Sequence, residues 1–69
     1  MIEVFRTNVG DMEQVSRLRL LLVERFGLSR ISFDLDDHER VLRVEGTSIS
    51  PEHIIGTLCE NGFECSVME

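Results

Sequence analysis

The sequence predicts an α+β domain in which strands and helices follow one another in the order β-α-β-β-α-β. Four short segments alternate apolar and polar residues, which is the period of a half-buried strand. Two longer segments repeat apolar residues at helical spacing between a start signal and a glycine. No linker, repeat or low-complexity stretch interrupts the 69 residues, so we expect one domain over residues 1–69.

The four predicted strands cover residues 2–7, 31–35, 42–44 and 63–68. In the first strand we expect Ile2 and Val4 to face the core. The expected core residues of the second and third strands are Ile31, Phe33, Leu35, Leu42 and Val44. The opposite face of the sheet then carries Glu3, Phe5, Ser32, Asp34, Arg43, Glu64 and Met68. Because most of these are polar, we expect a solvated face with two apolar members.

The two predicted helices cover residues 12–26 and 51–60. Asp11 followed by Gln14 fits a capping box, and Ser50-Pro51 is a typical helix start. Gly27 and Asn61-Gly62 are the expected stop signals. The buried stripes comprise Val15, Leu18, Leu21, Leu22 and Phe26 in the first helix, and Ile54, Ile55, Leu58 and Cys59 in the second.

This order of elements predicts a ferredoxin-like fold, with a four-stranded antiparallel sheet and both helices on one face. Thirteen acidic residues against seven scattered arginines give a net charge of −6, which disfavours binding to nucleic acid or to an anionic membrane surface. No segment resembles a signal peptide or a membrane span, and two cysteines do not make a dense disulfide framework. We therefore expect a cytoplasmic protein.

At nearly full length the chain resembles a heavy-metal-associated (HMA) domain, the module of copper chaperones and metal-transporting ATPases. The resemblance rests on the strand-loop-helix spacing, on R-I-S-F-D-L-D-D-H-E-R-V-L-R-V-E-G, and on S-P-E-H-I-I-G-T-L-C-E-N-G-F-E-C. It implies the ferredoxin-like fold and a metal site in the first loop, where the family carries M-x-C-x-x-C.

The loop of this chain departs from the family's metal motif. In one register Val9 replaces the methionine, and Asp11 and Gln14 replace the two cysteines; in a register three residues earlier, Asn8 and Asp11 do so. A carboxylate and an amide cannot replace thiolates for copper(I) or zinc. We therefore expect Asp11 and Gln14 to cap the helix, with a hard-cation role for Asp11 as the alternative. We expect no cofactor.

The remaining metal candidates are Cys59, Cys65 and the acidic turn around His38. The two cysteines lack C-x-x-C spacing and are expected to be reduced core thiols; a redox pair, or a metal site completed by a second chain, is the alternative. Asp36, Asp37, His38 and Glu39 are consecutive, so a solvated turn is favoured over a binding site. His53 is expected on the surface.

No catalytic combination of side chains can be recognised in the sequence, so we expect a protein that is not an enzyme. We expect instead a protein-interaction or self-association module that has lost the thiolate site, with an unknown protein partner or a second copy bound through the open sheet face. Phe5, Met68 and Phe63 are the candidate contact residues, although Phe63 also fits a packing role beneath the first loop. Metal handling through Cys65, Cys59 or His38 is the alternative function.

Overall fold

The structure is a computed structural model that describes residues 1–68. It confirms the predicted order of elements. These are β1 (Ile2–Thr7), α1 (Met12–Phe26), β2 (Arg30–Asp34), β3 (Val41–Glu45), α2 (Pro51–Glu60) and β4 (Cys65–Val67). The protein thus belongs to the α+β class, with the ferredoxin-like layout.

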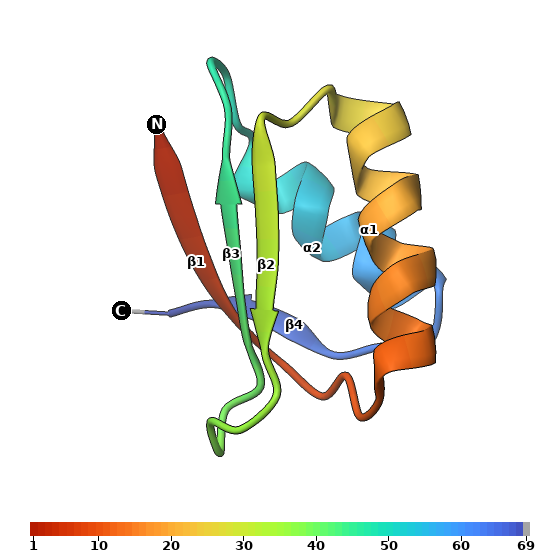
Figure 1. Cartoon of the computed structure of the whole chain (residues 1–69). Helices are drawn as coiled ribbons and strands as arrows, with labels where there is room; N and C mark the ends of the chain where they lie inside the picture. Colours follow the sequence, from red (N-terminus) through yellow and green to blue (C-terminus); the bar gives the residue numbers. More distant parts are fainter. Residues whose placement is uncertain (69) are drawn as a thin grey trace.

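All four strands form one antiparallel sheet in the order β2-β3-β1-β4. Both helices cover the same face of this sheet, and the other face has no layer of described residues over it (Figure 1). The two sequential hairpin strands, β2 and β3, lie side by side, while β1 is inserted between β3 and β4. As a result β2 and β4 are the two edge strands.

The ends of α1 follow the predicted signals. Asp11 Oδ1 accepts a hydrogen bond from the backbone N–H of Gln14 at 2.9 Å, and Gln14 Oε1 accepts one from the N–H of Gly10 at 2.8 Å. Gly27 ends the helix in the left-handed region with φ 61°, which a residue without Cβ adopts at little cost. In α2, Pro51 opens the helix as expected, whereas Ser50 occupies the N-cap position without a side-chain capping bond.

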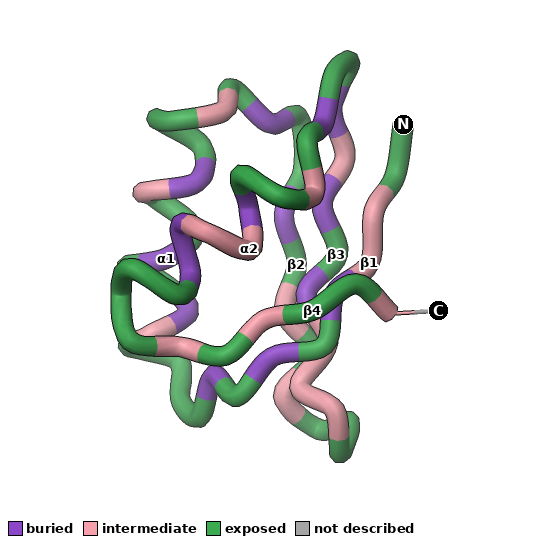
Figure 2. The backbone as a smooth tube through the Cα atoms, turned by 180° about the vertical axis from the view of Figure 1, so that it is seen from behind, coloured by how far each residue is buried: buried purple, intermediate pink, exposed green. Residues whose placement is uncertain are grey.

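The core lies between the helical layer and the sheet (Figure 2). Its buried apolar members are Phe5, Val9, Val15, Leu18, Leu22, Leu28, Ile31, Leu42, Val44, Ile49, Ile54 and Leu58. The predicted inward residues of β2 and β3 are confirmed, with Phe33 half-buried. Leu21, Phe26 and Ile55 are also half-buried, because they lie at the borders of the helix stripes.

The predicted facing of β1 was wrong. Phe5 is fully buried opposite Leu42, while Ile2 remains 56% exposed on the other face. Side chains alternate between the two faces along a strand, so an error about one residue of β1 assigns all its residues to the wrong faces. Burying Phe5 rather than Ile2 removes more apolar area from water. The hydroxyl of Thr7, which is carried inward with Phe5, is satisfied by donating to the Arg40 carbonyl.

Candidate functional site

The loop between β1 and α1 comprises residues 8–11 and is where the resemblance to HMA domains implied a metal site. Asp11 and Gln14 are both engaged in the cap of α1, as described above. Asn8 bonds to the start of β4 instead, because its Oδ1 accepts from the Glu64 N–H at 2.8 Å. Val9 is fully buried in the core. The polar side chains of this loop therefore hold the fold together.

The positively charged, half-buried side chain of Arg40 contacts the same loop. Its Nη1 donates to the carbonyls of Val9 and Gly10 at 3.4 and 3.5 Å. Arg40 adopts a left-handed backbone conformation with φ 47°, at the end of the β2–β3 hairpin. A guanidinium beside these carbonyls disfavours a metal cation at the same place by charge repulsion. Nothing in the sequence indicated this contact, because it joins residues about thirty positions apart.

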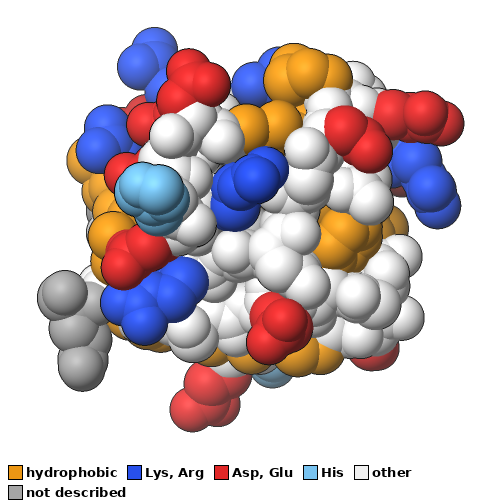
Figure 3. Space-filling view, turned by 90° about the horizontal axis from the view of Figure 1, so that it is seen from below, with side chains coloured by type: hydrophobic (Ala, Val, Ile, Leu, Met, Phe, Trp, Pro, Cys, Tyr) orange, Lys and Arg blue, Asp and Glu red, His pale blue; other side chains and the backbone are white. Residues whose placement is uncertain are grey.

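In the acidic hairpin Asp36 and Asp37 are exposed and Glu39 is half-buried. Asp34 Oδ1 accepts from the Asp36 N–H, and Asp37 Oδ1 accepts from the Glu39 N–H, so two carboxylates stabilise the turn. Arg6 forms an exposed ion pair with Glu39 at 3.5 Å. His38 is exposed. Figure 3 views this end of the molecule, where acidic and basic side chains are interspersed.

The two cysteines occupy neighbouring parts of α2 and β4. Cys65 is half-buried against the core, and burial raises the pKa of its thiol from about 9 to about 12, with a smaller contribution from nearby Cys59. Cys59 is exposed, so the expectation that it belongs to the core was wrong. It lies one position beyond the buried Leu58, on the solvent side of the helix. Both thiols are free.

Across residues 1–68, no three side chains of the metal-binding types His, Cys, Asp and Glu come together in a group that could hold an ion. Asp11 caps α1 and His38 lies on the exposed hairpin, whereas Cys59 and Cys65 lie near each other.

The open face of the sheet is lined by the outward residues of β1, β2 and β3 and by Met68. Its apolar members are Ile2, Val4, Val41 and the half-buried Met68. Its charged members are Arg6, Arg30, Arg43, Asp34 and Glu45, of which Arg30 and Glu45 form an exposed ion pair at 3.5 Å. The prediction that Met68 lies on this face is consistent with the depression it lines with Val4 and Val41. Phe5 is wrong as a contact candidate, since it is inaccessible.

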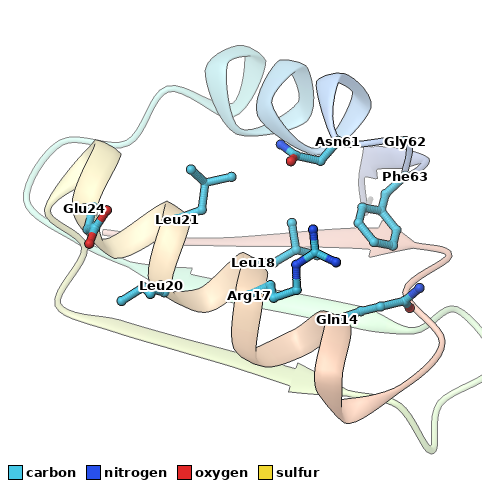
Figure 4. A pocket seen from close by; sticks show the side chains of 9 residues that line it. All are labelled: Gln14, Arg17, Leu18, Leu20, Leu21, Glu24, Asn61, Gly62 and Phe63. Atoms are coloured by element: carbon cyan, nitrogen blue, oxygen red, sulfur yellow. The ribbon is translucent and has the colours of Figure 1, made fainter.

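A second surface feature is a groove between α1 and the turn from α2 to β4, with a volume of about 590 Å³. Leu18, Leu21 and Phe63 give it apolar walls. Arg17, Gln14 and Phe63 lie together at one end, and Glu24 lies at the other (Figure 4). Phe63 is half-buried against the core, in keeping with a packing role, and its role as a contact stays a prediction.

No protein-family model and no curated protein matches this chain. The resemblance to HMA domains therefore rests on the residues quoted above. Within the described part of the chain, neither helix has the length and the hydropathy that crossing a bilayer requires.

Proposed function

We propose that this protein is a self-association module, an HMA-like domain without thiolate ligands that acts as a homodimer through its sheet layer. The proposal is non-enzymatic. It places the module in the cytosol, where two free cysteines stay reduced, and it involves no nucleic acid. The open face and the free edges of the sheet are the two kinds of surface available to a second copy.

The charge distribution of the sheet layer carries this proposal. Its outward strand residues include three arginines and two carboxylates, whereas the remaining residues of the sequence contain four arginines and eleven carboxylates. Two copies with a net charge of −6 repel each other over most of their surfaces. The sheet layer is close to neutral, so two copies can approach there, either face to face or edge to edge.

The small core gives a reason why association is favourable. Ile2 is 56% exposed and Val67 is 40% exposed, at the sheet, in a chain of only 69 residues. A domain of this size buries a small share of its surface, and binding to a second copy stabilises the folded state by mass action.

Sedimentation equilibrium between 1 and 100 μM protein tests the proposal. We expect a mass that rises from one chain to two across this range, and a single-chain mass at 100 μM would contradict it. Leu20→Asp is a matched control, because Leu20 is 63% exposed on α1, beside the groove and away from the sheet. We expect this variant to dimerise as the unmodified protein does, whereas a loss of dimer would move the interface to the side of α1 that carries Leu20.

A further inference from the structure

The free edge of β2 offers unpaired backbone groups. β2 lies at the end of the sheet, with β3 on one side only. The N–H of Gly46 donates to the Met1 carbonyl at 3.1 Å, which continues the ladder between β3 and β1. Because backbone groups alternate in direction along a strand, Val44 bonds toward β1 and Arg43 bonds toward β2.

This alternation decides which residues of β2 direct their backbone N–H and C=O groups to the free side of the sheet. Ser32 lies opposite Arg43 and uses its backbone groups in the sheet. Ile31 and Phe33 therefore direct their N–H and C=O groups to the free side. The side chain of Arg19 agrees with this assignment, since its Nη2 donates to the Ile31 carbonyl at 2.9 Å. An edge of this kind is a template for another strand.

The strand β2 reads Arg30-Ile31-Ser32-Phe33-Asp34. When it is placed beside an antiparallel copy of itself, opposite charges face each other at the ends and apolar residues face each other next to the centre. We infer that the β2 edge pairs with the β2 edge of a second copy, antiparallel and with the two-fold axis at Ser32. In this register Arg30 of each copy lies opposite Asp34 of the other, on the open face. Ile31 lies opposite Phe33 on the helical face, where each Phe33 is only half-buried in one chain.

The side of α1 that carries Arg19 extends this surface. Met12 and Val23 lie seven positions before and four positions after Arg19, on the same side of the helix. They are 67% and 42% exposed. The two-fold axis at Ser32 brings opposite ends of the two α1 helices together, so that Met12 of one copy approaches Val23 of the other. The dimer then buries apolar side chains as well as pairing strands.

The existing contacts of the edge are compatible with this pairing. Each Ile31 carbonyl has two lone pairs, so it can keep the Arg19 bond and also accept from Phe33 N–H of the second copy. The ion pair of Arg30 with Glu45 is long, at 3.5 Å, and exposed, which makes a second carboxylate beside Arg30 favourable. The result is a continuous eight-stranded sheet with all helices on one side.

This inference rests on the proposed function and is tested by disulfide trapping of the register. In the paired edge, Ser32 of the two copies forms a non-hydrogen-bonded pair with Cα atoms about 4.5 Å apart, within the range of a disulfide. We expect Ser32→Cys to give a covalent dimer with oxidised glutathione, which accepts the two electrons and two protons released by the thiols. Peptide mass spectrometry separates this bond from any bond through Cys59 or Cys65.

Two further cysteine variants supply the control for register. In Arg30→Cys alone or Asp34→Cys alone, the new thiols of two copies are roughly 14 Å apart, four residues along the strand, and we expect no crosslink. An equal mixture of these two variants should crosslink, because positions 30 and 34 face each other. Crosslinking of either variant alone, to the same extent as Ser32→Cys, would overturn the register.

Charge exchange tests the same register without cysteine. Arg30→Asp or Asp34→Arg places like charges opposite each other at both ends of the paired strands, and we expect about tenfold weaker dimerisation. The double variant restores both pairs and should restore the dissociation constant. Val4→Asp, on the open face, should leave the dimer unchanged. A dimer that is lost in Val4→Asp and gives no Ser32→Cys crosslink would support self-association but overturn the edge, whereas a monomer at 100 μM would overturn both.

Discussion

At the scale of single residues, side chains that resemble ligands in the sequence are structural in the folded chain. Asp11 and Gln14 satisfy backbone N–H groups at the start of α1, and a cap of this kind stabilises a helix by about 1 kcal/mol. Arg40 donates to two loop carbonyls from the neighbouring hairpin. The chain's own groups thus hold the loop through these hydrogen bonds.

Cys65 gives a prediction at this scale. Because burial raises the pKa of its thiol to about 12, very little thiolate is present at pH 8. We expect iodoacetamide to modify Cys65 at least about tenfold more slowly in the folded protein than in the same chain in urea. Timed alkylation with peptide mass spectrometry measures both rates. Equal rates would show that Cys65 is not shielded.

The same shift sets a dependence of stability on pH. The pKa of Cys65 is higher in the folded protein than in the unfolded chain, so between about pH 9 and pH 12 the unfolded chain loses a proton that the folded protein retains. Stability from this group is complete below pH 9 and falls as the pH rises through this window. A Cys65→Ala variant should lack this part of the decrease in urea denaturation.

At the scale of elements, adjacent residues of β1 lie on opposite faces of the sheet and therefore differ in burial. Phe5 is fully buried opposite Leu42, and Val4 lies on the open face. We expect Phe5→Ala to lower the free energy of unfolding by about 3–5 kcal/mol and Val4→Ala to lower it by less than about 1 kcal/mol. Urea denaturation of the two variants at one protein concentration measures both values. Equal losses would mean that the facing of β1 is not as described.

Most elements were predictable because their signals are local. The cap at Asp11, the stop at Gly27 and the alternation of Ile31, Leu42 and Val44 each depend on residues close in the sequence. The strand β1 was harder, since apolar residues stand on both of its faces: Ile2 and Val4 on one, Phe5 on the other. The choice between them depends on the register with β3, which is a property of residues about forty positions away.

The candidate surfaces were predictable only in part, for the same reason. The presence of an open sheet face followed from the order of elements, but its apolar members did not, because Phe5 is replaced there by Ile2, Val4 and Val41. The opposite charges of Arg30 and Asp34 stand at the two ends of a five-residue strand and can be read from the sequence. The sequence does not show that this strand is an edge of the sheet, and only an edge strand can pair with a second copy.

At the scale of the whole molecule, net charge and local charge pairs act on dimerisation in opposite directions. Two copies with a charge of −6, about 25 Å apart given dimensions of 28 × 25 × 19 Å, repel by about 6 kcal/mol in water without salt. Screening lowers this repulsion to about 2.6 kcal/mol at 0.01 M ionic strength and to about 0.5 kcal/mol at 0.1 M. Salt therefore favours the dimer by about 2 kcal/mol over this range.

The two Arg30–Asp34 pairs are exposed and lose at most about 1 kcal/mol in total when salt is added. The gain from screening exceeds this loss, so we expect the dissociation constant to fall about fivefold between 0.01 and 0.1 M ionic strength. Sedimentation equilibrium at the two salt concentrations measures it. In the Arg30→Asp variant the end pairs repel, so salt should tighten that dimer by a larger factor. A dimer of the unmodified protein that weakens with salt would show that charge pairs, rather than apolar contacts and strand pairing, dominate the interface.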